Sequence, residues 1–316
     1  SVLTQEELGR LAARPAGLIV IDGAPFSHPM LRVLGLEIPT VILDGAQAAR
    51  LPAGAEALVD GADGLIVVPP PPQGLGQRPI PQAPQPGGPV LSADGAAVEL
   101  RASVSGVAAA AAACRHGAAA IGLVRSEYLI PPSGALPDAA FYQDAFRAIC
   151  QAAAPLTVTI RLLDVAGDKR PPWLEEIPGR GGVLGLQGAR LYRYEPVRGV
   201  FLAQVEGAGR AAVRHPLRLL IPYLTALEEA EHWRQEIEGH LGRALPLGAM
   251  VETPAAALAI RDWLEVVDFV ALGTNDLMQC LFAADRDLPE VRPFLDPYAP
   301  VLYRLLRQIA EAAGGR

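Results

Sequence analysis

Cysteine and aromatic residues are scarce in this chain of 316 residues. The three cysteines, Cys114, Cys150 and Cys280, are odd in number and far apart, which argues against a disulfide framework. Aromatic residues make up 5% of the chain and hydrophobic residues 51%, so aliphatic side chains must supply most of the core. This composition is common in α/β proteins, and we expect reduced thiols in a cytoplasmic protein.

Long apolar runs and an excess of positive charge are also missing. No stretch approaches the ~20 apolar residues of a membrane-spanning helix, and no basic segment followed by an apolar one opens the chain. We therefore expect no membrane association. The formal net charge of -7 at pH 7 argues against nucleic acid as the main partner.

Proline and glycine, in contrast, are concentrated in residues 69–89. The run of four prolines at 69–72 and the later Pro-Gln-Pro-Gly-Gly disfavour both helix and sheet. We expect a semi-extended linker here, between a small domain over residues 1–68 and a larger one over 90–316. In the small domain, apolar runs at 17–21 and 40–43 predict strands, with a helix over 29–36 between them. A hairpin is expected at 57–59 and 64–68, around Asp60-Gly61.

Apolar runs alternate with amphipathic segments throughout the larger domain. Helices are predicted over 107–116, 141–153, 227–241, 255–264 and 300–313. The predicted strands are 98–103, 120–124, 156–162, 183–186, 217–221, 245–250 and 267–272. Repeated β-then-α units of this number predict a (β/α)8-type, TIM-like barrel. Seven strands are one too few, so either one strand escapes the pattern or the barrel does not close within this sequence.

Charged side chains follow most of these predicted strands. In a (β/α) barrel the active site forms at the carboxyl ends of the strands, so we expect these side chains to lie together. Glu252 follows the sixth strand and Asp276 the seventh, so two successive strands each end in an acid. The others are Arg125, Glu127, Arg161, Asp164, Asp168, Lys169, Arg190, Asn275 and Arg286.

This set of residues suits a small, doubly anionic substrate. Arginine forms planar, two-pronged hydrogen bonds to phosphate and carboxylate groups. Glu252 and Asp276 offer the oxygen ligands that Mg²⁺ prefers, and the metal would bridge them to substrate oxygens. Phosphoryl transfer needs little more than such positioning and charge neutralisation. Any one arginine also fits a surface or salt-bridge role, but their coincidence at successive strand ends favours a shared site.

His28 is the notable residue of the small domain. It follows a predicted strand and starts a predicted helix, where unpaired backbone N–H groups favour an anion. An imidazole in this position can accept a phosphoryl group. A lone histidine after a strand is, however, more often a helix-capping or packing residue.

These segments resemble the bacterial phosphoenolpyruvate-protein phosphotransferases, enzyme I of the sugar phosphotransferase system. The matching segments occur in the same order, at 124–129, 160–169, 184–190, 250–256, 273–277 and 285–286. The region around His28 is similar to part of the family's swivelling phosphohistidine domain, in which Thr-Ser-His precedes an apolar helix and a Gly-x-x-x-Pro turn. Here Gly35 to Pro39 keep that turn, and Phe26 stands in place of the threonine.

The resemblance implies a mechanism. Phosphoenolpyruvate would be bound by Arg125, Arg161, Arg190, Asn275 and Arg286, with Mg²⁺ held by Glu252 and Asp276. His28 would take the phosphoryl group and pass it to a small phosphocarrier protein, releasing pyruvate. Family members dimerise through the barrel, so the resemblance also implies a homodimer.

The sequence departs from the family pattern in places. The family barrel ends with an eighth strand whose Gly-x-Cys-Gly-Glu segment protonates the enolate of pyruvate, and this sequence contains no such segment. Cys280, after the seventh strand, is expected to be a small buried thiol. The carrier-docking helical domain and the start of the phosphohistidine domain also have no counterpart. Without the proton donor we expect the chemical step to be slower by ~10² to 10⁴.

Two alternatives remain open from the sequence. A pyruvate-phosphate dikinase-like or phosphoenolpyruvate synthase-like enzyme would need a nucleotide-binding domain, which the sequence does not show. A non-catalytic phosphoenolpyruvate-binding or sensor module would bind the metabolite without becoming phosphorylated. The missing cysteine segment favours this module, whereas His28 argues against it.

Overall fold

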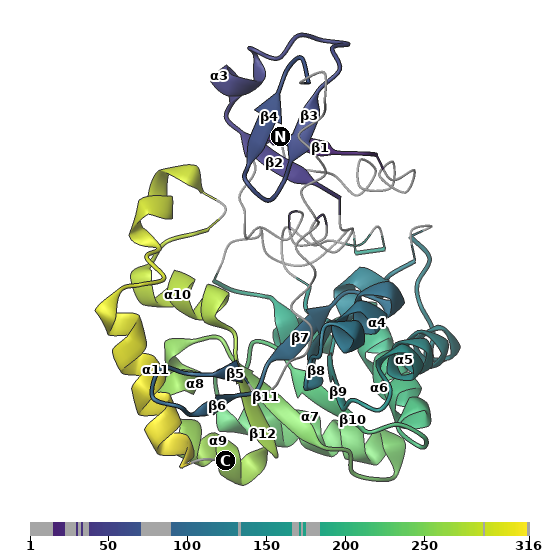
Figure 1. Cartoon of the computed structure of the whole chain (residues 1–316). Coiled ribbons are helices and arrows are strands. Elements are labelled where there is room, and N and C mark those ends of the chain that lie inside the picture. Colours follow the sequence, from purple (N-terminus) through teal and green to yellow (C-terminus); the bar gives the residue numbers. More distant parts are fainter. Residues whose placement is uncertain are drawn as a thin grey trace. The chain divides into compact units, whose positions relative to one another are not determined.

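The computed structural model describes residues 15–22, 30, 33, 38–70, 90–131, 134–165, 171, 173–174, 184–286 and 288–314. They belong to two compact units, Ser1–Gly87 and Gly88–Arg316, whose elements are labelled in Figure 1. The division falls within the predicted linker, of which residues 71–89 lie outside the described part of the chain. No helix among the described residues has the length and apolar character needed to cross a membrane.

Unit 1 contains two small sheets. Strands β1 (Leu18–Ile21) and β2 (Thr40–Leu43) pair in parallel, and β3 (Leu58–Asp60) and β4 (Leu65–Val67) form an antiparallel hairpin. These elements agree with the predicted strands and hairpin. The one-turn helix α3 (Gly45–Ala48) follows β2 and is capped by the side chain of Asp44. Of the helix predicted over 29–36, only residues 30 and 33 are described, and both are buried and helical.

A curled parallel sheet of six strands forms the centre of unit 2. Its order, β12-β11-β10-β9-β8-β7, follows the sequence, so each strand pairs with the next one along the chain. This is the connectivity of a (β/α) barrel, and the predicted fold class is confirmed. The strands are β7 (Arg101–Val104), β8 (Ala120–Arg125), β9 (Val158–Arg161), β10 (Leu217–Ile221), β11 (Leu247–Val251) and β12 (Phe269–Leu272). A short exposed hairpin, β5 (Val90–Leu91) with β6 (Ala97–Val98), precedes them.

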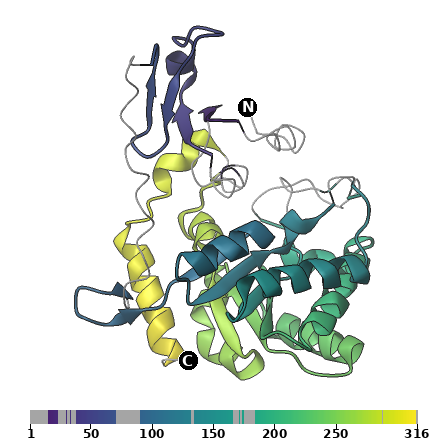
Figure 2. The ribbon, with the colours of Figure 1, turned by 45° about the vertical axis from the view of Figure 1, so that its right-hand side comes forward.

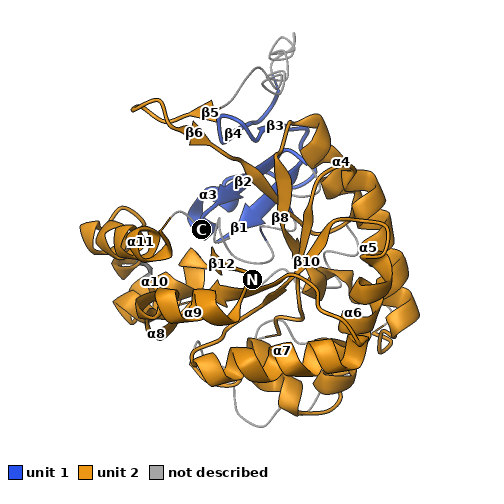
Figure 3. Ribbon diagram, turned by 90° about the horizontal axis from the view of Figure 1, so that it is seen from below, with its two compact units in different colours: residues 1–87 blue, residues 88–316 orange. Residues whose placement is uncertain are grey.

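Helices cover the outer face of this sheet, as the view along the strands shows (Figure 3). Neighbouring helices pack against one another around the sheet, and α4 and α5 lie side by side on one flank (Figure 2). The helices are α4 (Val107–Arg115), α5 (Ala139–Ala153), α6 (Val197–Ala211), α7 (Leu227–Leu241), α8 (Pro254–Leu258), α9 (Ile260–Val266), α10 (Thr274–Phe282) and α11 (Pro300–Ala313). Shorter 3-10 turns are η2 (Ser126–Leu129), η3 (Gly188–Arg193) and η4 (Pro289–Phe294). The core between the sheet and the helices is apolar and closely packed.

The strand predicted at 183–186 is wrong. Residues 184–186 form bends that lead into η3, and residue 183 lies outside the described residues. Strand β9 pairs directly with β10, so the sheet has no place for a strand between them. Gly185 in this segment and Gly188 just after it adopt positive φ angles of 140° and 53°, outside the range of a regular strand. The described sheet therefore has six strands where the sequence predicts seven.

Two helices differ from the prediction. Helix α6 (Val197–Ala211) is not predicted, because Gly199, Gly207 and Gly209 weaken its helical pattern. The helix predicted over 255–264 is divided at Ala259 into α8 and α9. The predicted helices at 227–241 and 300–313 have the predicted bounds.

Candidate active site

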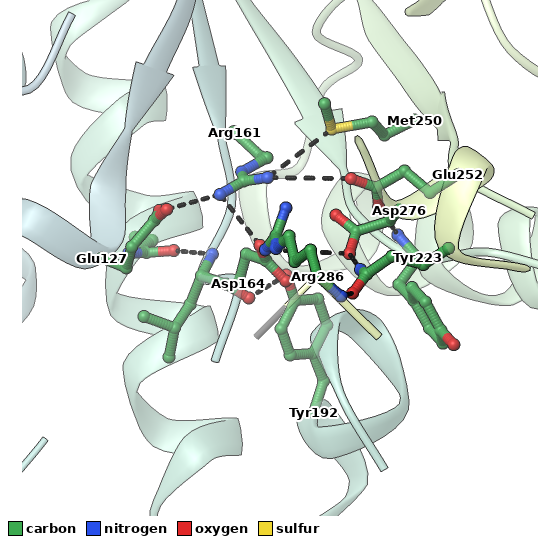
Figure 4. Close-up of polar contacts among 12 residues, drawn as sticks. Glu127, Arg161, Asp164, Tyr192, Tyr223, Met250, Glu252, Asp276 and Arg286 are labelled. Atoms are coloured by element: carbon green, nitrogen blue, oxygen red, sulfur yellow. Dashed lines mark hydrogen bonds and ion pairs between the residues drawn. The ribbon is translucent and has the colours of Figure 1, made fainter. Parts of the chain in front are cut away.

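Arg161 is the centre of a buried ion-pair cluster at the carboxyl ends of the strands of unit 2 (Figure 4). Its Nη2 atom lies 2.5 Å from Glu127 Oε1 and 2.9 Å from Asp164 Oδ2. Its Nη1 atom lies 3.8 Å from Glu252 Oε1. Burial by itself lowers the pKa of Arg161, but the carboxylates, Asp164 and Glu127 foremost, raise it well above its ordinary value. The guanidinium therefore stays charged although its side chain is only 5% exposed.

Glu252 directly follows β11 and is 2% exposed. Its Oε2 atom accepts a hydrogen bond of 2.9 Å from the backbone N–H of Tyr223. Gly273 packs against its other side, where a Cβ atom at position 273 would lie 2.3 Å from Glu252 Cγ. Burial, followed by the negative charge of Asp164, raises the pKa of Glu252 to about 8.

Asp276 lies in the first turn of α10, next to Glu252 in Figure 4. Its Oδ1 atom accepts a hydrogen bond of 2.8 Å from Gln279 Nε2 and lies 3.9 Å from Arg286 Nη2. Gln279 Oε1 in turn accepts a bond of 2.9 Å from the backbone N–H of Arg286. Gln279 thus holds Asp276, at the start of α10, close to Arg286, which follows the end of that helix.

Arg125 and Arg190 are two further predicted site residues, at the end of β8 and within η3. Arg125 ends β8 and is in register with Arg161 on β9. The Nε atom of Arg125 is buried and makes no hydrogen bond within the part of the chain that the structure describes. Arg190 donates to Gly185 O (3.0 Å) and to Thr225 Oγ1 (3.2 Å), and its Cζ atom lies 5.2 Å from the centre of the Tyr223 ring.

The backbone that carries Asp164 is held by two buried side chains. After β9 the chain continues as an irregular buried segment, 162–165. Gln204 Oε1, from α6, accepts a bond of 2.7 Å from Leu163 N, and Tyr192 Oη, from η3, donates one of 2.8 Å to Leu163 O. The Tyr192 ring stacks on Phe201 with ring centres 4.5 Å apart, which fixes the hydroxyl. Buried backbone groups need such partners, and here side chains supply them.

The structure brings together most but not all of the predicted site residues. Arg161 is ion-paired with Glu252, Glu127 and Asp164, and Arg286 is ion-paired with Asp276 close by. Asn275 is exposed in the first turn of α10, and no hydrogen bond or ion pair joins it to the cluster among the described residues. His28, Asp168 and Lys169 lie outside the described residues.

The carboxylates present fit a magnesium ion. No group of three or more His, Cys, Asp or Glu side chains in the described part of the chain is arranged to hold a metal. Mg²⁺ commonly uses only one or two protein carboxylates and completes its shell with water and phosphate oxygens. Burial, then the charge of Asp164, raises the pKa of Glu252, and a cation at Glu252 and Asp276 would offset both effects by favouring the charged carboxylate.

Several residues of this site are not predicted from the sequence. Gln279 could have been found, because a residue three positions after Asp276 on a helix shares its face. Tyr192, Gln204 and Tyr223 carry no such signal, since each acts through tertiary contacts of its side chain or backbone. Cys280, on α10, is half-buried, and burial, then Asp276, raises the pKa of its thiol.

Comparison with known proteins finds relatives that align over most of this chain. A multiphosphoryl transfer protein of Rhodobacter capsulatus is 32% identical, and the alignment covers 98% of this chain and 39% of that protein. Phosphoenolpyruvate-protein phosphotransferases of Streptomyces coelicolor and Bacillus subtilis are 33% and 28% identical. These two alignments cover 94% and 92% of this chain and 54% of each relative, so the chain spans about half the length of those proteins.

The family match covers the whole of unit 2. Residues 83–316 match the family described as PEP-utilising enzyme, PEP-binding domain. The match includes the six-stranded sheet and every residue of the ion-pair cluster around Arg161. The chain therefore belongs to the family of PEP-utilising enzymes.

Proposed function

We propose that this chain is a phosphoenolpyruvate-dependent phosphotransferase whose substrate binds at the carboxyl ends of β8 to β12. The main support is the ion-pair cluster around Arg161. Side chains that follow β8, β9 and β11 meet there in one buried place, with Asp276 after β12 close by, within a domain of the PEP-utilising family. Such a convergence of arginines and carboxylates suits a small substrate that carries both phosphate and carboxylate.

The arginines supply the anion-binding groups in this proposal. Arg125 and Arg161 lie side by side on neighbouring strands, and the buried Nε atom of Arg125 is a donor for which a substrate oxygen is a natural acceptor. Arg190 and Arg286 add positive charge from η3 and from the segment after α10. Arg161 is already paired with carboxylates, so it also keeps those acids in place.

Glu252 and Asp276 are the proposed magnesium ligands. When bound, Mg²⁺ would supply positive charge at the phosphoryl oxygens. Glu252 is oriented for this role by the Tyr223 N–H and by Gly273, and Asp276 by Gln279.

His28 is the proposed phosphoryl acceptor. The bond between phosphorus and the enol oxygen of phosphoenolpyruvate breaks, and a bond between phosphorus and an imidazole nitrogen forms. The enolate that leaves takes up a proton and becomes pyruvate. The phosphohistidine then passes its phosphoryl group to a small phosphocarrier protein.

Intact-protein mass spectrometry tests this proposal. The chain is incubated with phosphoenolpyruvate and Mg²⁺, and His28→Ala is compared with the matched control His116→Ala. We expect one acid-labile phosphoryl group on the parent and on His116→Ala, and none on His28→Ala. An adduct that survives in His28→Ala would refute the assignment of the acceptor.

The same experiment separates the enzyme from a binding module. If phosphoenolpyruvate protects the chain against thermal unfolding but no adduct forms, the chain is a sensor or binding module without phosphotransfer. If it neither protects nor modifies the chain, phosphoenolpyruvate is not its ligand.

A further inference from the structure

Tyr223 has an unusual backbone conformation beside the site. It follows β10 with a φ angle of 55°, in the left-handed region that residues with a side chain seldom adopt. It is also 4% exposed, so the conformation is held inside the protein. Asp22 and Ala283 are the other non-glycine residues with positive φ in the described part of the chain. Left-handed residues of this kind occur often at functional sites, where the surroundings hold them in place.

Tyr223 contacts both halves of the site. Its backbone N–H donates to Glu252 Oε2 at 2.9 Å. Its ring lies under the Arg190 guanidinium, with 5.2 Å between Cζ and the ring centre, at a distance typical of a cation–π contact. Its hydroxyl is hydrogen-bonded with the side chain of Gln187, at the start of η3. One residue therefore connects the proposed metal ligand with one of the proposed substrate arginines.

The φ angle decides whether both contacts can exist at once. Rotation about the N–Cα bond sets the direction of Cα–Cβ relative to the N–H. With the N–H directed at Glu252, a change of φ from 55° to an ordinary negative value would swing the ring away from Arg190. The left-handed conformation is thus required for the pair of contacts, and not for either one alone.

Gly188 holds this conformation from the other side. A Cβ atom at position 188 would lie 2.7 Å from Tyr223 Cβ and 3.2 Å from Pro222 O, so η3 packs directly against the residue. Gly188 itself has a φ angle of 53°, and a side chain there would be strained even without this contact.

We propose that Tyr223 is a positioning residue that fixes Glu252 and Arg190 relative to one another. The left-handed backbone orients the carboxylate, and the ring orients the guanidinium. The expected effect of Tyr223 on phosphoenolpyruvate binding rests on the proposed function. The geometry around Glu252 does not depend on the substrate and can be probed by a metal alone.

Three substitutions separate the backbone from the ring. Tyr223→Phe keeps the ring and the conformation. Tyr223→Gly removes the ring but adopts positive φ freely, whereas Tyr223→Ala removes the ring and keeps the Cβ that opposes positive φ. Tyr223→Asn is a second variant that tolerates the left-handed region, in case the glycine variant does not fold.

Two readouts are measured on the full chain. Electron paramagnetic resonance gives the affinity for Mn²⁺ alone, and calorimetry gives the affinity for phosphoenolpyruvate in the presence of Mg²⁺. We expect Tyr223→Phe to stay within about twofold of the parent in both. Tyr223→Gly and Tyr223→Asn should keep Mn²⁺ affinity but lose about tenfold in phosphoenolpyruvate affinity, because the ring under Arg190 is gone. Tyr223→Ala should lose phosphoenolpyruvate affinity and also about fivefold in Mn²⁺ affinity.

The glycine and alanine variants decide the question. If Tyr223 only filled space, glycine would be no better than alanine in any readout, since it adds flexibility and removes one more carbon. Equal loss of Mn²⁺ affinity in Tyr223→Gly and Tyr223→Ala, or full phosphoenolpyruvate affinity in Tyr223→Gly, would overturn the inference. A parent that binds Mn²⁺ but not phosphoenolpyruvate refutes the proposed function and leaves the Mn²⁺ comparison to decide the inference. A parent that binds neither refutes both.

Discussion

Glu252 is the residue whose protonation the fold alters most clearly. Burial and the neighbouring Asp164 raise its pKa from an ordinary 4.5 to about 8, although Arg161 and the Tyr223 N–H act in the opposite direction. The acid pattern in the sequence identifies Glu252 as a candidate ligand. Its raised pKa comes only from the charges and the buried surroundings that the tertiary structure places around it.

The raised pKa predicts a pH-dependent stability in the absence of divalent cations. Between the two pKa values the folded state keeps a proton that the unfolded state releases, so a rise in pH favours unfolding. We expect the unfolding temperature in chelator to fall from about pH 5 to about pH 8, by about 2 to 4 °C for each kcal/mol lost. Glu252→Gln, which does not titrate, should be less dependent on pH and more stable than the parent at the upper end. An unfolding temperature that rises with pH across this range would contradict the assignment.

Gly273 gives a second prediction at the scale of one residue. In Gly273→Ala the new Cβ would lie 2.3 Å from Glu252 Cγ and 2.7 Å from its Oε1, so the carboxylate must move. We expect a loss of about 1 to 3 kcal/mol in the free energy of unfolding. Mn²⁺ affinity should fall about tenfold, since the proposed ligand is displaced.

A matched control for this substitution is available on α7. Gly239→Ala makes the same chemical change where no atom lies within 4 Å of the new Cβ. There we expect unchanged Mn²⁺ affinity and a gain of about 0.5 to 1 kcal/mol from helix propensity. Unchanged Mn²⁺ affinity in Gly273→Ala as well would show that Glu252 does not bind the metal.

At the scale of elements, helix α6 shows how tertiary contact overrides local propensity. Its glycines disfavour a helix, yet Gly207 lets α6 approach α5 so closely that a Cβ would lie 2.7 Å from Gln143 N. The same helix places Gln204, which is fully buried, against the segment that carries Asp164. Neither the helix nor the role of Gln204 follows from the sequence pattern, because both depend on the helix beside it.

Gln204→Leu tests this contact between elements. The substitution leaves the Leu163 N–H buried without an acceptor, and we expect a loss of about 1 to 3 kcal/mol in the free energy of unfolding. Phosphoenolpyruvate affinity should fall as well, because Asp164 and its partner Arg161 lose their fixed backbone. Gln143→Leu, on the partly exposed face between α5 and α6, is the control, with an expected change below about 0.5 kcal/mol. Chemical denaturation measures the free energy of unfolding of the two variants. An equal loss in both would argue against the role of Gln204.

At the scale of the whole molecule, the two units have separate apolar cores. Val20, Met30 and Val33 form a small core in unit 1, whereas the large core and the complete ion-pair cluster belong to unit 2. A unit with its own core is expected to fold without the rest of the chain.

Residues 88–316 expressed alone should therefore fold cooperatively and be stabilised by phosphoenolpyruvate with Mg²⁺. They should not become phosphorylated, because the proposed acceptor, His28, belongs to unit 1. Circular dichroism tests whether the unit folds, and thermal unfolding tests its stabilisation by phosphoenolpyruvate. Mass spectrometry tests for phosphorylation, with the full chain as reference. Phosphorylation of the isolated unit would place the acceptor within it.

The sequence by itself determined the α/β class, the alternation of strands and helices, and the identity of the charged residues at the strand ends. These features are local, since they depend on runs of apolar residues and on the residues directly after each run. Only the tertiary structure decided that β9 pairs directly with β10, that α6 is a helix, and that Tyr223 is left-handed. These depend on which neighbour occupies a given place, and a pattern along one chain does not contain that information.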